Sequence, residues 1–199
     1  MFKRLLGLIA AGVLVLAFVP AALAVRVHIR VEGRTTTIFG ATQPFVSAKA
    51  TVLDALEAAS GRGEFYYHVK QFSFGALVDQ IGRYANAGSN GWTYKVNGAV
   101  APVAADQQML KDGDVVLWYW TTFSETGGPK TLVLTRAGKR NCYRVLAQDD
   151  AGKESVARGA VLNVDRRTVL TKAGRACLRG SHGLVRATLA GAIRSNALP

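Results

Sequence analysis

This sequence of 199 residues has few of the side chains on which catalysis and metal binding usually depend. It contains 2 Cys, 3 His and 2 Met, and 13 Asp and Glu against 25 Lys and Arg. Three scattered histidines provide no zinc-ligand spacing, and no serine stands in a strand–turn–helix elbow with a base. The carboxylates are sparse and lie mostly in turns, so they do not indicate a glycosidase-type pair. We therefore expect no enzymatic activity, no metal and no cofactor.

Long hydrophobic runs are absent beyond the start of the chain. There, Lys3-Arg4 precedes an uncharged stretch over residues 5–19 and the small-residue ending Ala21-Ala22-Leu23-Ala24. This order is typical of a secretory signal peptide, residues 1–24. An uncleaved anchor is the alternative, but the stretch is short for a bilayer and a proline follows it. We expect a secreted or extracellular protein, associated with the cell envelope, with no transmembrane span after signal cleavage.

Only two cysteines are present, Cys142 and Cys177. Outside the cytoplasm an even number of cysteines predicts a disulfide. A catalytic thiol or a metal pair is the alternative, but neither cysteine lies in a CxxC motif or within three residues of a histidine.

Positive charge dominates this sequence, with a formal net charge of +12. Such basicity points to nucleic acid, a membrane surface or an anionic polymer. It is uneven, because residues 25–124 hold nine Lys and Arg against eight Asp and Glu, whereas residues 125–199 hold fourteen against five. The basic character therefore belongs to the C-terminal part of the chain.

Residues 25–124 are predicted to form one domain. Residues 25–31 alternate apolar and basic side chains as an amphipathic strand does, and residues 35–39 are rich in β-formers. Thr51 is a good N-cap, with Asp54 in the capping-box position, for a helix that Gly61 should end. Alternating segments at 65–69 and 77–81, the run 92–96 before an Asn-Gly turn, and residues 115–123 predict further strands. We therefore expect an α+β fold with one main helix on a mixed sheet.

The rest of the chain is predicted to be a short linker and a second domain. Residues 125–129 contain the linker glycines, and turn signals recur about every ten residues over 130–199. No helical stretch stands out between them. We expect a small, basic all-β sandwich with one disulfide.

Several motifs lie in order over residues 30–122: Thr51-Val52-Leu53-Asp54-Ala55-Leu56, Phe74-Gly75, Ile81-Gly82, the run Gly91 to Gly98, and the run Leu110 to Trp120. Together they resemble a secreted bacterial domain family of unknown function, grouped with the C-terminal domain of transcobalamin and intrinsic factor. The resemblance implies a β-grasp-like fold. Residues 140–196 more loosely resemble bacterial Ig-like or carboxypeptidase-regulatory-like β-sandwich modules.

In transcobalamin the corresponding domain covers one face of a corrinoid, and a separate α-helical barrel supplies most of the pocket. This chain shows no such helical domain. The resemblance therefore implies small-molecule, corrinoid-like binding only with a partner protein that completes the pocket, or a weaker contact through aromatic side chains.

Aromatic side chains are the candidates for ligand binding: Tyr66, Trp92, Tyr94, Trp118 and Trp120. Trp92 and Tyr94 point to one face of their strand, and Trp118 and Trp120 point to one face of theirs. This arrangement is typical of core residues or of cross-strand aromatic pairs. The alternative is an exposed stacking platform for a sugar or a planar cofactor. Both interpretations stay open at this point.

Basic side chains of the second domain are the candidates for binding an anionic surface: Arg166, Arg167, Arg175, Arg179 and Arg186. A solvated surface is the alternative. Nucleic acid is not expected, because secretion removes that partner and few aromatics interleave with the arginines. We therefore expect a secreted, non-enzymatic binding protein whose basic module attaches to an anionic cell-envelope polymer or lipid surface.

Overall fold

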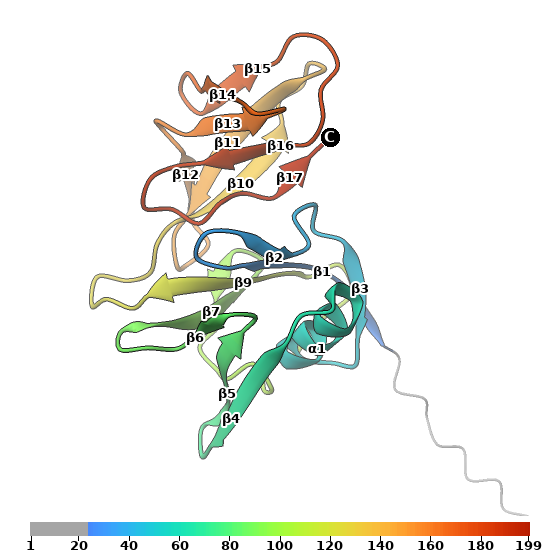
Figure 1. The fold of residues 1–199 in the computed structure, drawn as a ribbon, viewed down its shortest axis with the longest axis vertical. Coiled ribbons are helices and arrows are strands. Elements are labelled where there is room, and N and C mark those ends of the chain that lie inside the picture. The colour runs from blue at the N-terminus through green and yellow to red at the C-terminus, as the bar shows by residue number, and fades with distance from the viewer. Residues whose placement is uncertain (1–23) are drawn as a thin grey trace, which may run out of the picture.

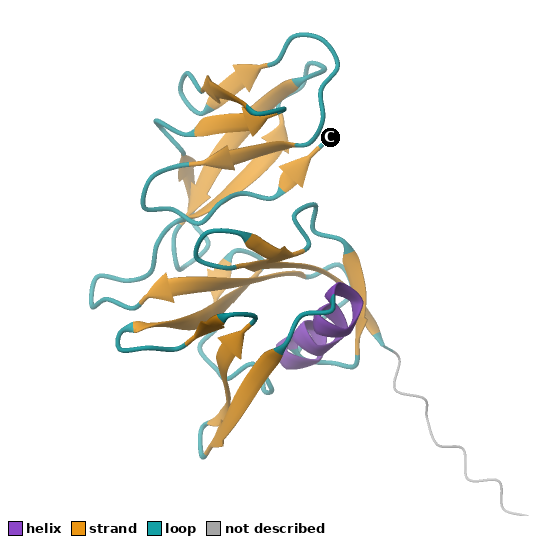
Figure 2. Ribbon diagram, viewed as in Figure 1, coloured by secondary structure: helices purple, strands orange, loops and turns teal. Residues whose placement is uncertain are grey.

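The structure, a computed structural model, describes residues 24–199 (Figure 1). The predicted signal peptide lies outside the described residues, except for its last position. Within the described range there are one helix and seventeen strands, distributed over four sheets (Figure 2). We call β1 to β9 with the helix the N-terminal unit, and β10 to β17 the C-terminal unit.

The largest sheet is a mixed, six-stranded sheet in the N-terminal unit. Its centre is β1 (Val25–Glu32), which pairs in parallel with β9 (Val115–Thr122), as the register His28 to Val115 shows. The other strands are antiparallel to their neighbours: β2 (Thr37–Phe39) and β3 (Phe45–Ala48) on β1, β7 (Asn90–Val96) on β9, and β8 (Ala99–Val100) on β7.

The helix α1 (Val52–Gly63) begins with the predicted capping box. The Thr51 side chain accepts from the backbone N–H of Asp54, and the Asp54 carboxylate accepts from the backbone N–H of Thr51 at 2.8 Å. The expected end at Gly61 is wrong. The helix continues to Gly63 and ends where Glu64 adopts a left-handed conformation, φ 51°, because a solvent-facing glycine weakens a helix without stopping it.

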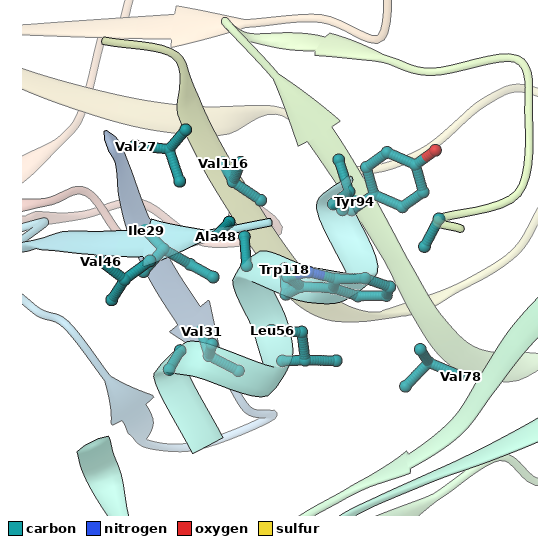
Figure 3. Packing of buried hydrophobic residues seen from close by; sticks show 14 of the residues in the cluster. Val27, Ile29, Val31, Val46, Ala48, Leu56, Val78, Tyr94, Val116 and Trp118 are labelled. Atoms are coloured by element: carbon teal, nitrogen blue, oxygen red, sulfur yellow. The ribbon is translucent and has the colours of Figure 1, made fainter. Parts of the chain in front are cut away.

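The core of the N-terminal unit lies between α1 and the six-stranded sheet (Figure 3). Alternate residues of β1, namely Val27, Ile29 and Val31, point to the helix and are fully buried. They pack with Leu56 of α1 and with Trp118 of β9. The other face of the sheet points to the C-terminal unit.

A separate three-stranded sheet flanks this core, with β4 (Tyr67–Phe72), β5 (Gly75–Ile81) and β6 (Tyr84–Ala85). The predicted Asn-Gly hairpin joins β7 to β8. Asn97 and Gly98 both have positive φ, 51° and 90°, as the turn type requires.

The C-terminal unit holds two four-stranded sheets that share one hydrophobic cluster. In the first, β11 (Cys142–Gln148) pairs with β10 (Thr131–Arg136), β12 (Glu154–Val156) and β15 (Arg175–Cys177). The second has the order β14 (Arg167–Leu170), β13 (Val161–Val164), β16 (Val185–Thr188) and β17 (Ala197–Leu198). The predicted disulfide joins Cys142 to Cys177, which are direct partners across β11 and β15.

The α+β fold class, with a β-grasp-like domain and one helix on a mixed sheet, is wrong for this chain. Over residues 24–199 a single 12-residue helix stands against strands in four sheets, so the protein is mostly β. The sequence interpretation took one well-capped helix as sufficient to define an α+β class. One helix of this length covers only part of one sheet face, and strand pairing organises the remainder.

No helix of residues 24–199 is long and apolar enough to span a membrane. The predicted domain boundaries, 25–124, 125–129 and 130–199, and the β-sandwich resemblance stay predictions.

Candidate functional site

Three of the predicted ligand-binding aromatics come together at one apolar groove of about 330 Å³, which we call the aromatic groove. Trp92, Tyr94 and Trp118 line it, although only 3%, 7% and 2% of these side chains are exposed. The ring centroids of Tyr94 and Trp118 are 5.1 Å apart (Figure 3). Phe74 and Phe123 also line the groove and are exposed. The predicted residues thus form mainly core, and the groove rim comes from phenylalanines that the sequence interpretation did not select.

Polar atoms in this groove are few. The Tyr94 hydroxyl donates to the Val103 carbonyl at 2.7 Å, and burial raises the pKa of Tyr94 to about 12. Trp92 Nε1 donates to the Tyr84 carbonyl at 2.8 Å. Trp118 Nε1 is buried and has no hydrogen-bond partner within the described chain.

The other two predicted aromatics do not line the aromatic groove. Trp120 is half-buried and lines a larger groove of about 560 Å³ between the two units, together with Arg34, Asn90 and Ile193. Tyr66 is 59% exposed just before β4. Trp120 nevertheless lies directly opposite Trp92 across β7 and β9, with ring centroids 5.6 Å apart, and packs against the same core. The five aromatics do not form one exposed platform, because alternation along β7 and β9 directs the two aromatics of each strand to the core face, and Tyr66 lies apart from them.

Four of the five predicted surface arginines are exposed. Arg166 and Arg167 lie at the turn between β13 and β14, and Arg175 and Arg179 lie on and just after β15. The Asp165 carboxylate accepts from the backbone N–H of Gly183 at 3.1 Å. This contact ties the β13–β14 turn to the loop that follows Arg179.

Around the disulfide these arginines meet further cations. We call Lys139, Arg140, Arg144, Arg175 and Arg179 the disulfide-side basic cluster. Arg144 and Arg175 are direct partners across the antiparallel pair β11–β15, so their side chains leave the same face of the sheet. Hydrogen bonds from Asn141 to Gly180 O and from Leu178 N to Asn141 O bring the segments of Arg140 and Arg179 together.

The disulfide-side basic cluster has no acidic counterpart in the part of the chain that the structure describes. The ion pairs among residues 24–199 involve none of its five members, and their cations are Arg30, Lys70, Lys95, Arg167, Arg186, Arg194 and His68. Directly opposed like charges destabilise a strand pair. The sequence interpretation did not select Arg144, because the pairing of β11 with β15 cannot be deduced from local sequence patterns.

Arg186 does not belong to the exposed basic set. Its guanidinium donates to the Glu32 carboxylate and to the Thr37 hydroxyl, both in the N-terminal unit. Burial lowers the pKa of Arg186, and Glu32 opposes that shift. The prediction of an anionic-surface role for Arg186 is therefore wrong, because the fold brings it to the boundary between the units.

Charged side chains on the outer face of the six-stranded sheet are buried at that boundary. Arg30, Glu32 and Lys95 are 2%, 0% and 0% exposed. Arg194 also donates to Glu32, at 2.9 Å, so three guanidinium groups share one carboxylate. Lys95 Nζ donates to the Asp149 carbonyl at 2.6 Å and lies 3.8 Å from Asp150 Oδ1.

The three histidines lie apart. His28 bonds to the Gln43 carbonyl, His68 pairs with Asp79 at 2.6 Å, and His182 lies 3.4 Å from the Tyr143 hydroxyl. Among residues 24–199 no group of three or more His, Cys, Asp or Glu side chains is placed to hold a metal ion.

A domain family of unknown function, DUF4430, matches residues 49–122. The match covers α1 and the strands from β4 to β9, which include the aromatic groove, and it confirms the resemblance for that part of the chain. No curated protein matches the chain.

Proposed function

We propose that this protein is a secreted, non-enzymatic binding protein that acts at the cell surface or envelope, where its basic C-terminal unit attaches to an anionic polymer or lipid surface. The observation that carries the proposal is the Arg144–Arg175 pair, directly opposed across β11 and β15. A sheet that places two cations opposite each other loses stability in the free protein. An anionic partner bound at the two arginines would replace this repulsion by attraction and would stabilise the sheet.

The surrounding charge supports this choice. Eleven of the fourteen Lys and Arg after residue 124 are exposed. Asp165 and Arg166 form the two-residue turn between β13 and β14, with the positive φ values of 46° and 61° that such a hairpin turn requires, and this turn presents Arg166 and Arg167 to solvent. Attraction of this kind is long-ranged at low salt and screened at high salt.

Vesicle co-sedimentation tests the proposal. The protein without residues 1–24 should bind vesicles rich in phosphatidylglycerol, or a soluble polyphosphate, and not phosphatidylcholine vesicles. Binding should fall steeply as salt rises. The double variant Arg144→Gln/Arg175→Gln should bind about 30-fold more weakly at low salt, since each basic residue near an anionic surface contributes about 1 kcal/mol.

A charge-matched control separates site from net charge. Lys49→Gln/Lys111→Gln removes two exposed cations from the N-terminal unit and should change binding by less than threefold. Equal losses in both double variants, or binding that does not depend on salt, would contradict a local attachment site.

Small-molecule capture at the aromatic groove is a second candidate function. The convergence of Trp92, Tyr94 and Trp118 and the unpartnered Nε1 of Trp118 favour it. A groove of about 330 Å³ holds only one edge of a corrinoid-like ligand, so a partner protein would cover the rest.

Tryptophan fluorescence tests this second candidate. Titration with cyanocobalamin, corrected for absorbance, should quench the wild-type emission to saturation, and Phe74→Ser at the rim should weaken that binding. Tyr66→Ser, which lies outside the groove, should leave it unchanged. Linear, non-saturating quenching that is the same in all three proteins would argue against the groove.

A further inference from the structure

A second cavity lies between the two units and carries positive charge at its wall. Its volume is about 320 Å³. Arg30, Gln43 and Lys95 of the N-terminal unit and Val133 and Gln148 of the C-terminal unit are among its lining residues. We call it the inter-unit cavity. It shares none of its lining residues with the aromatic groove.

Arg30 lines this cavity, and the structure shows hydrogen bonds from only two of its five N–H donors. The bonds that the structure shows for its guanidinium both leave from Nη1, to Glu32 Oε1 at 3.2 Å and to the Arg194 carbonyl. Nε is buried and has no partner among residues 24–199. Nε and Nη2 lie on one edge of the planar guanidinium, the edge that binds the two oxygens of a carboxylate or phosphate.

The local charge balance is positive. Glu32 is shared by Arg30, Arg186 and Arg194, so three buried or half-buried cations face one carboxylate. Burial lowers the pKa of Arg30 to about 10, and the neighbouring charges of Arg186 and Arg194 add to that shift, while Glu32 opposes it. A buried cation without full compensation is costly, and a bound anion would supply the missing charge.

Lys95 adds charge without adding a free donor. Its ammonium group donates to the Asp149 carbonyl and to the Thr131 hydroxyl at 3.3 Å, and it faces Asp150. The oxyanion would therefore bind to Arg30. The remaining wall is partly apolar, with Val115, Leu117 and Val133, which suits a ligand that has a compact hydrocarbon body.

We infer that the inter-unit cavity is a binding site for a small organic oxyanion, whose carboxylate or phosphate accepts hydrogen bonds from the Nε and Nη2 edge of Arg30 and whose apolar body lies against Val115, Leu117 and Val133. Because both units line the cavity, such a ligand also bridges them. This inference does not depend on the proposed surface attachment, which concerns the opposite end of β11.

Calorimetric titration with benzoate, phenyl phosphate and benzamide tests the inference. Benzoate and phenyl phosphate should bind the intact chain, and neutral benzamide, which has the shape of benzoate, should bind at least about tenfold more weakly. The Arg30 Nε–H signal in a 1H–15N spectrum should shift on addition of benzoate. A stronger response to phenyl phosphate than to benzoate would assign the natural ligand to phosphates, and the reverse to carboxylates.

Two variants and a control complete the test. Val133→Phe fills the cavity without changing charge and should abolish benzoate binding. Val100→Phe, an exposed position outside the cavity lining, should not. Arg30→Gln should weaken binding at least about tenfold. If that variant does not fold, the comparison of benzoate binding by Val133→Phe and Val100→Phe still tests the inference. No binding of either anion at 10 mM, or benzoate binding that survives Val133→Phe, would overturn the inference.

Discussion

The carboxylate of Glu32, on β1, accepts hydrogen bonds from Arg194, near the C-terminus, at 2.9 and 3.1 Å. The two residues are 162 positions apart, and Glu32 is fully buried. Arg30 and Arg186 bind the same carboxylate. This single acid therefore holds three cations at the boundary between the units.

Removal of that acid should be among the most damaging single changes in the chain. Glu32→Gln leaves Arg30 buried without its counterion, and loss of one partner of a buried ion pair costs about 3–5 kcal/mol. Urea denaturation of the chain without residues 1–24 measures the loss. Glu125→Gln, an exposed acid in the predicted linker, is the control and should change the free energy of unfolding by less than about 0.5 kcal/mol. A loss below 1 kcal/mol in Glu32→Gln would mean that water replaces the carboxylate.

The disulfide should account for a large part of the stability of the C-terminal unit. It joins residues 35 positions apart, and closing a loop of this length stabilises by about 3–4 kcal/mol on the chain-entropy model. Cys142→Ser/Cys177→Ser should lower the free energy of unfolding by about that amount. The unreduced native protein should show no titratable thiol, and two thiols in that assay would refute the pairing.

The three tryptophans should differ in access to solvent. Trp92 and Trp118 are 3% and 2% exposed, whereas Trp120 is half-buried at the groove between the units. Acrylamide should therefore quench mainly Trp120. Trp120→Phe should remove most of the quenchable emission, and Trp92→Phe, the matched control, should leave the quenching constant nearly unchanged or raise it. Similar quenching of all three would contradict the packing of β7 and β9.

The capping box should make the stability of α1 depend on pH in the acid range. Burial alone would raise the pKa of Asp54, but hydrogen bonds from Thr51 and Ala50 and the charge of Lys49 hold it below its usual value. A carboxyl with a lowered pKa in the folded state contributes stability above its unfolded pKa of 3.8 and loses it as the pH falls through the folded value.

Asp54→Asn should therefore cost about 1 kcal/mol near pH 7, and the difference from the wild type should shrink below about pH 4. Thr51→Ser keeps the N-cap hydroxyl and should cost much less at either pH. Denaturation curves at pH 7 and at pH 2.5 measure both effects. A difference that persists undiminished at the lower pH would show that the Asp54 charge plays no part.

Local signals in the sequence predicted local structure well. The capping box at Thr51 and Asp54, the Asn97-Gly98 hairpin and the disulfide are all confirmed. Each depends on residues close in sequence, or on an even cysteine count, and needs no knowledge of the fold. The fold class was wrong for the same reason, since one strong helix signal said nothing about how many strands would pair elsewhere.

The sites depended on pairings that no local pattern contains. The alternation along β1 correctly separates Val27, Ile29 and Val31 from their neighbours, but it assigns the intervening charged face to solvent. Arg30 and Glu32 lie on that face and are buried, because Arg186 and Arg194 cover it from more than 150 residues away.

The basic charge of the C-terminal part, the disulfide, the capped helix and most strand segments could be predicted before the fold was known, since each follows from composition or from neighbours along the chain. Which charges are paired became clear only from the folded chain. In the fold, Arg144 lies opposite Arg175, and Arg186 is paired with Glu32 at the boundary between the units. Arg30 lines a cavity with some of its N–H donors unpaired. Strand register and unit contact join residues far apart in sequence, and solvation and charge compensation depend on those contacts.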